Sequence, residues 1–183
     1  MTQLILFAVG SIIITAISWK SLRKPGSHGF YRFFAWEIIL GLFLVNVKFW
    51  FYKPFVWNQI IAWLLLFASL LPLIFGVHSL RTRGKPAHRR ESDSSLLAFE
   101  KTTQLVTSGI YRYIRHPLYS SLFLLTWGIF FKSISSLTFV LAGISTVFLV
   151  LTAKADEAEC TLFFGEYYLE YMKHTKRFVP YIF

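Results

Sequence analysis

Long apolar runs separated by short polar segments dominate the chain. The first three runs cover residues 4–19, 33–51 and 55–80. At 1.5 Å of rise per residue, helices formed by the second and third runs are long enough to cross the ~30 Å hydrocarbon core of a lipid bilayer. Basic residues directly follow the first run, whereas a cleavable signal peptide carries its positive charge before the apolar region. All three runs are therefore expected to be retained membrane helices.

The fourth apolar run, residues 118–153, is too long for one ordinary membrane helix. A single helix of that length would measure roughly 54 Å and overshoot the hydrocarbon core. Its polar break covers residues 132–136 and begins with Lys132, the only charged residue of the run. A turn at this break predicts a short helix over 118–131 and a full-length helix over 134–153.

Glutamate and aromatic side chains recur at helical spacing after the fourth run. They are Glu159, Glu166 and Glu170 on one face and Phe163, Tyr167 and Tyr171 on another. This pattern predicts an amphipathic helix at the membrane interface, broken or kinked at Gly165. The expected fold is therefore an all-α polytopic integral membrane protein with five transmembrane helices plus a C-terminal amphipathic interfacial helix.

Composition and charge support a membrane protein. Hydrophobic residues make up 55% of the 183 residues, and charged residues make up 15%. If the N-terminus lies outside, 16 of the 19 lysines and arginines fall on the inner side, so the N-terminus is expected outside and the C-terminus in the cytosol. The basic residues cluster between apolar runs, a distribution that favours membrane orientation over nucleic-acid binding.

The sequence lacks the residues that several classes of functional site require. The single cysteine, Cys160, excludes an intramolecular disulfide and any zinc site built from several cysteines. The histidines form no HExxH motif, and no two glycines are spaced as in a GxGxxG loop. We therefore expect no metal site and no glycine-rich nucleotide loop.

Residues 105–121, LVTSGIYRYIRHPLYSS, carry the densest chemical signal. Arg115 and His116 immediately precede Pro117, a favoured first residue of a helix. A helix N-terminus beside basic side chains suits a carboxylate or a phosphate. The alternative is a basic anchor with interfacial tyrosines, which many membrane proteins have.

A second signal is the pair of carboxylates at Asp156 and Glu157, which follows the last predicted span. Adjacent carboxylates at the negative end of a helix dipole require cationic partners. These partners could belong to a binding site, or could be Arg115 or Lys154 in an ordinary ion-pair network.

Together, the two segments resemble the integral-membrane methyltransferases typified by isoprenylcysteine carboxyl methyltransferase and the phospholipid methyltransferases. The matching positions are Leu105, Val106, Gly109, Tyr111, Arg115, His116, Pro117, Tyr119, Asp156, Glu157, Phe164, Gly165, Tyr168, Tyr171, Arg177 and Pro180. The order and spacing of the family pattern are kept over about 80 of the 183 residues. Asp156 is a departure, because the family usually has Glu at that position.

The resemblance implies a methyltransferase that uses S-adenosylmethionine, with residues 1–80 forming three N-terminal membrane helices and residues 81–183 forming the catalytic region. It implies a lipid or prenylated acceptor that enters from the bilayer, with no nucleic acid and no metal involved. The implied catalytic residues are Arg115 and Glu157, and the implied cofactor-binding residues are Gln104, Leu105, Val106, Tyr111, His116, Pro117, Tyr119 and Glu157.

Adjacent residues on a helix point about 100° apart, so Asp156 and Glu157 cannot both face one pocket. We expect Glu157 to line the site and Asp156 to pair with Arg112 or Arg115. Two other functions remain open: an NADPH-dependent enzyme similar to the sterol reductases, and a membrane scaffold without catalytic activity.

Overall fold

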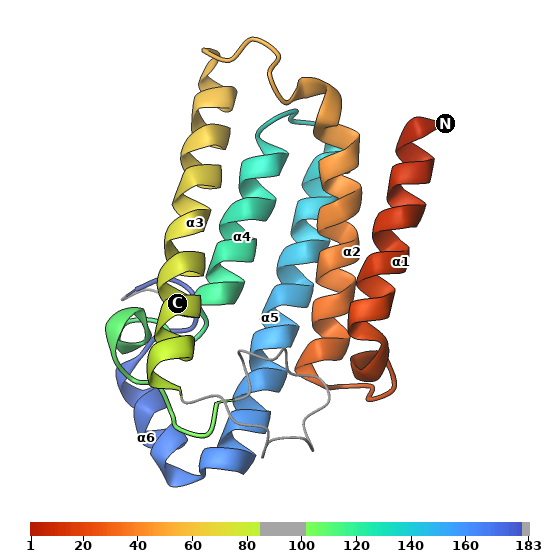
Figure 1. Cartoon of the computed structure of the whole chain (residues 1–183). Coiled ribbons are helices and arrows are strands. Elements are labelled where there is room, and N and C mark those ends of the chain that lie inside the picture. Colours follow the sequence, from red (N-terminus) through yellow and green to blue (C-terminus); the bar gives the residue numbers. More distant parts are fainter. Residues whose placement is uncertain (85–101, 181–183) are drawn as a thin grey trace.

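Five long helices lie side by side in a computed structural model that describes residues 1–84 and 102–180 (Figure 1). They are α1 (Thr2–Leu22), α2 (His28–Asn46), α3 (Trp57–Arg83), α4 (Pro117–Phe130) and α5 (Ser136–Phe164), with α6 (Glu166–His174) at one end of the bundle. Two 3₁₀ turns, η1 (Val47–Phe49) and η3 (Gly109–Arg112), complete the described elements. The prediction of an all-helical membrane fold is confirmed.

Four of these helices, α1, α2, α3 and α5, are long and apolar enough to cross a membrane. The fifth, α4, has 14 residues and measures about 21 Å, which is shorter than the hydrocarbon core. Its end at Phe130 and the start of α5 at Ser136 confirm the turn predicted at the polar break. Lys132 in this turn is nevertheless buried, and its Nζ lies 3.5 Å from the centroid of the Trp63 ring.

The C-terminal helices differ from the prediction. The last membrane helix was expected to end at Ala153, but α5 continues for eleven residues to Phe164. Gly165, whose φ is +61°, ends α5 in a conformation that glycine adopts most readily. The first half of the predicted amphipathic helix is therefore part of α5, and α6 is a separate helix of nine residues. The interfacial position of α6 stays a prediction.

Packing places α4 between α3 and α5, while α2 lies against α5 and α1 lies against α2. Small and polar side chains let α4 and α5 approach each other, with Thr126 Oγ1 3.3 Å from Ser145 Oγ. A Cβ on Gly76 of α3 would lie 3.1 Å from the Pro117 ring, so this glycine allows α3 to touch the first turn of α4. These contacts hold the start of α4 in place.

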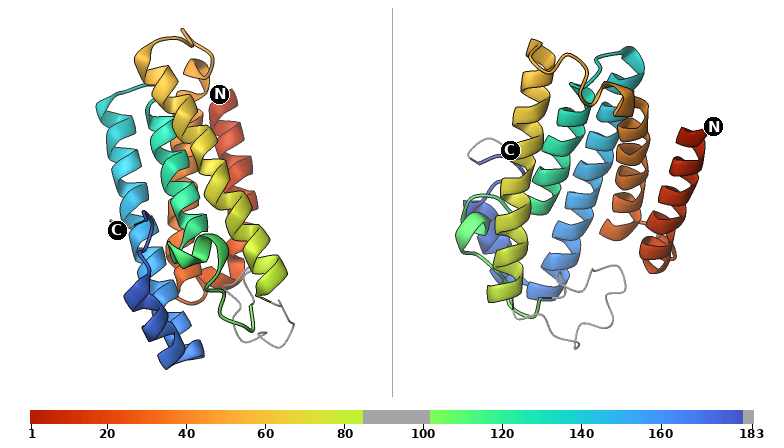
Figure 2. Two further views of the ribbon diagram at one scale, coloured as in Figure 1. Left: turned by 90° about the vertical axis from the view of Figure 1, so that its left-hand side faces the viewer. Right: turned by 45° about the horizontal axis from the view of Figure 1, so that its top comes forward.

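The segments that carry the two chemical signals meet at one end of the bundle. The end of α3, the start of α4, the end of α5 and α6 all lie there, opposite the N-terminus of α1 (Figure 1; Figure 2). Helices α1 to α5 alternate in direction, so α6, which follows the fifth helix, lies at the end opposite the N-terminus. The fold therefore brings residues about forty positions apart into one neighbourhood.

Candidate functional site

A cavity lies at this end of the bundle, between the start of α4, the end of α5, α6 and the segment that precedes α4. It holds about 750 Å³ of space, including its open mouth. Its walls are formed by Leu80, Thr102, Leu105, Val106, Tyr111, Arg115, His116, Pro117, Leu118, Tyr119, Asp156, Glu159, Cys160, Phe164, Tyr168 and Tyr171.

The chain after α6 pairs with the chain before α4. Backbone N–H groups of Arg115 and His116 donate to the carbonyls of Lys176 and Arg177 at 2.7 and 3.1 Å, and the Lys176 N–H donates to the Tyr113 carbonyl at 3.1 Å. The Ser120 hydroxyl also donates to the Phe178 carbonyl at 2.8 Å. From its composition this C-terminal segment reads as a solvated tail, but these bonds make it part of the site.

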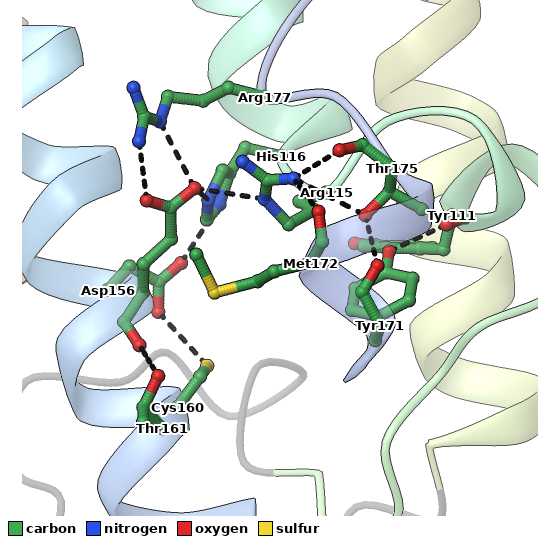
Figure 3. A network of polar contacts seen from close by, with 11 residues as sticks. Tyr111, Arg115, His116, Asp156, Cys160, Thr161, Tyr171, Met172, Thr175 and Arg177 are labelled. Carbon is green, nitrogen blue, oxygen red and sulfur yellow. Dashed lines mark hydrogen bonds and ion pairs between the residues drawn. The ribbon is translucent and has the colours of Figure 1, made fainter. Parts of the chain in front are cut away.

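Glu157 is the centre of an ion-pair network whose other members, Arg115, His116 and Arg177, are labelled in Figure 3. Its side chain is 7% exposed, and its Oε1 accepts from Arg115 Nε at 2.9 Å. Arg177 donates to the same carboxylate from Nη2 at 2.7 Å and from Nε at 3.1 Å. A carboxylate bound by two guanidinium groups joins α5 to the chain on both sides of the cavity.

His116 lies between the two carboxylates. Its Nδ1 is 3.3 Å from Asp156 Oδ2, and its Nε2 is 3.3 Å from Glu157 Oε1. Because carboxylates accept hydrogen bonds at both positions, this geometry favours the imidazolium, in which both ring nitrogens are donors. Burial alone would lower the pKa of His116, but the hydrogen bonds and charges of Asp156 and Glu157 outweigh it and raise the pKa above its ordinary value.

Asp156, and not Glu157, is on the cavity wall. The expected pairing of Asp156 with Arg112 or Arg115 is wrong, because Arg115 binds Glu157 and Asp156 faces His116. The two carboxylates do point in different directions, as the helix geometry requires. Sequence alone could not identify the inward direction, since it depends on how α5 is rotated against α4.

The Arg115 guanidinium also binds the end of α6. Its Nη1 donates to the Met172 carbonyl at 3.1 Å and to the Thr175 carbonyl (Figure 3). A cation at a helix C-terminus compensates the unpaired carbonyls and the negative end of the helix dipole. Arg115 therefore connects three segments around the cavity, and its expected catalytic role stays a prediction.

Most of the residues expected to bind a cofactor do come together. Those on the cavity wall are Leu105, Val106, Tyr111, His116, Pro117 and Tyr119. Gln104 is exposed and, like Glu157, is not part of the wall. The roles of these residues stay predictions, although their positions are now defined.

Sequence reasoning missed three contributors to this region. Arg177 belongs to the matched pattern, but only the structure shows that it binds Glu157. Tyr171 donates from its hydroxyl to the Tyr111 carbonyl at 2.6 Å and lines the cavity. Glu159 also lines the cavity, and its helical spacing from Asp156 was the only signal that could have indicated it.

Comparisons with known proteins find similarity in the part of the chain that forms this site. Residues 92–179 match the family model described as phospholipid methyltransferase. A curated protein named methanethiol S-methyltransferase, from Crocosphaera subtropica (strain ATCC 51142 / BH68), is 29% identical over 76 residues. That alignment covers 42% of this chain and 29% of the relative, so the chain matches well under half of the relative's length. No solved structure matches the chain.

Within residues 1–84 and 102–180, histidine, cysteine, aspartate and glutamate side chains form no group of three that could hold a metal ion.

The first prediction concerns the Glu157 network. Glu157→Gln should lower the free energy of unfolding by about 3 kcal/mol, because it leaves buried guanidinium groups without their counter-charge. Glu170→Gln is the control, since its carboxylate is 60% exposed and pairs with Lys173 at the surface, where ion pairs contribute little. Thermal unfolding of both variants in detergent measures the difference. Equal stability of the two variants would show that Glu157 does not hold the site together.

The second prediction concerns pH. Since the pKa of His116 is raised in the folded protein, its stabilising contribution is complete below the ordinary histidine pKa of about 6.5. That contribution should disappear as the pH rises through the raised pKa. His116→Gln should flatten this part of the curve of unfolding temperature against pH, whereas His78→Gln, at an exposed position on α3, should leave it unchanged. A wild-type curve without such a decline would contradict the charged state of His116.

Proposed function

The chain is similar to the phospholipid methyltransferases over residues 92–179, and from this premise we propose that it is a membrane methyltransferase that uses S-adenosylmethionine. The observation that carries the proposal is the cavity, where a cationic His116 and the carboxylate of Asp156 lie beside several tyrosine rings. The family and the relative support methyl transfer, and the cavity supports the identity of the donor.

The residues of the cavity fit this cofactor. S-adenosylmethionine carries a carboxylate, an ammonium group, a sulfonium and a flat adenine base. The free backbone N–H groups in the first turn of α4, beside the positive charge of His116, suit the carboxylate, and Asp156 suits a cation. The rings of Tyr111, Tyr119 and Tyr168 supply flat surfaces for the base and a cation–π environment for the sulfonium.

When bound, the cofactor supplies an activated methyl group, and the protein's main task is alignment. The acceptor atom, the methyl carbon and the sulfur must lie on one line, with water kept away. The Glu157 network fixes Arg115 and His116, while apolar Leu105 and Val106 on the wall limit access of water. If the acceptor is an amine it must also lose a proton.

A groove in the membrane part of the bundle supports an acceptor with a long apolar chain. It holds about 1120 Å³ of space, including its open side, and is lined by residues of α1, α2, α3 and α4 together with Trp50. Leu118 lines the cavity, and Leu122, Leu125 and Ile129 continue the same face of α4 along the groove. We therefore place the apolar chain of the acceptor in this groove, with its nucleophile at the cavity.

The orientation expected from the basic residues completes the proposal. At the cavity end of the bundle, Lys20 is in the last turn of α1, Arg83 is in the last turn of α3, and Lys176 pairs with Tyr113, so we assign this end to the cytosol. The water-soluble cofactor would enter there, while the acceptor would arrive from the bilayer. The alternative cofactor, NADPH, is less compatible, because Arg115 at the wall is already engaged by Glu157 and by α6 carbonyls.

Ligand binding tests the donor. S-adenosylhomocysteine at about 100 times its dissociation constant should stabilise the detergent-solubilised protein by about 2.7 kcal/mol, and NADPH should not. In sealed vesicles, transfer of labelled methyl groups into extracted lipid should require S-adenosylmethionine on the cytosolic side. Stabilisation by NADPH alone would overturn the proposed function, and transfer from the outer side alone would overturn the orientation.

A variant of the groove tests the acceptor. Leu125→Trp should raise KM for a long-chain acceptor by roughly tenfold, about 1.4 kcal/mol, because the larger side chain occupies the groove. Val147→Trp on the exposed face of α5 is the control and should leave KM unchanged. Binding of S-adenosylhomocysteine should be the same in both variants. Efficient transfer to methanethiol without transfer to lipids would overturn the long-chain acceptor while leaving methyl transfer intact.

A further inference from the structure

Glu159 is a cavity carboxylate outside the sequence motifs that indicated the site. It lies on α5 three residues after Asp156, and both side chains belong to the same wall. Residues at this spacing are neighbours on a helix surface. Its side chain is 27% exposed, so it is neither fully buried nor fully solvated.

The first residue of α2 holds Glu159 in place. The backbone N–H of His28 donates to Glu159 Oε1 at 2.9 Å, and His28 Nδ1 is 2.6 Å from Oε2. The His28 side chain is completely buried, and the Ser27 hydroxyl caps the same helix by accepting from the Phe30 N–H. A helix N-terminus and an imidazole therefore fix both oxygens of the carboxylate.

The three carboxylates in this part of α5 have different environments. Glu157 is engaged by two arginines and is not on the wall, whereas Asp156 and Glu159 are. Each carboxylate oxygen can accept more than one hydrogen bond, so Glu159 keeps acceptor capacity beyond its two bonds to His28. Two carboxylates one helical turn apart can accept from a single ammonium group.

We infer that Glu159, positioned by His28, binds the α-ammonium group of the methyl donor together with Asp156. This assignment rests on the proposed function, because it names a contact of the same cofactor. It makes α2 part of the site through His28, although α2 carries none of the matched motifs. It also gives the amino-acid part of the cofactor an anionic partner on α5 and a cationic one, His116, before α4.

Two ligands that differ only in the amino-acid part test the inference. S-adenosylhomocysteine carries the ammonium group, whereas 5′-methylthioadenosine has the same adenosine and a thioether but no amino acid. In calorimetric titrations, Glu159→Gln should weaken S-adenosylhomocysteine about tenfold and leave 5′-methylthioadenosine unchanged. Glu166→Gln, at an exposed position of α6, should alter neither affinity.

A second variant keeps the test informative if Glu159→Gln does not fold. Glu159→Asp keeps the charge but withdraws it by one methylene, and it should weaken S-adenosylhomocysteine selectively. Equal weakening of both ligands would show a structural role and overturn the inference, as would unchanged binding of both. A wild-type protein that binds neither ligand would overturn the proposed function itself, and this assignment with it.

Discussion

The buried carboxylate of Glu157 is the constraint on which the cavity depends. It joins Arg115, His116 and Arg177, which come from segments before α4 and after α6. An unpaired charge in this position would be costly, so the three cations and the carboxylate hold one another in a single arrangement. The backbone bonds between residues 113–116 and 176–177 hold the same two segments together, and Arg177 in the second of them binds Glu157. Glu157, which was expected to be catalytic, thus binds three side chains around the cavity, and its role in the reaction stays a prediction.

The membrane fold prepares this arrangement through the unequal lengths of α4 and α5. At 1.5 Å per residue, α5 is about 43 Å long and α4 about 21 Å, although both begin or end at the same turn. The last turns of α5 therefore extend beyond the start of α4, and Asp156 and Glu157 lie on this extension near His116. The close contact at Gly76 and the contacts with α3 fix the start of α4 against this extension.

Sequence reasoning was most successful where one local property decides the structure. Hydropathy and the break at residues 132–136 predicted the helices, and Pro117 predicted the start of α4. Sequence reasoning failed where contacts between distant segments determine the structure. No helix-breaking residue lies near Ala153, so α5 continues to Phe164. It ends at Gly165, because glycine adopts a positive φ readily. The inward direction of Asp156 and the partner of Arg177 depend on helix rotation and chain pairing, which spacing along the sequence does not contain.

The recessed start of α4 also suits the proposed reaction. In that reaction a water-soluble methyl donor and an acceptor with an apolar chain must meet at one atom, and neither can move far into the other's solvent without a large desolvation cost. Because α4 is short, its N-terminus and His116 lie deeper than the end of α5, with charged groups on one side and the apolar face of Leu118 and Leu122 on the other. In the proposed reaction the polar cofactor therefore binds at the end of the apolar groove that adjoins the cavity. The acceptor then needs to expose only its nucleophile, while its chain stays within the hydrocarbon region.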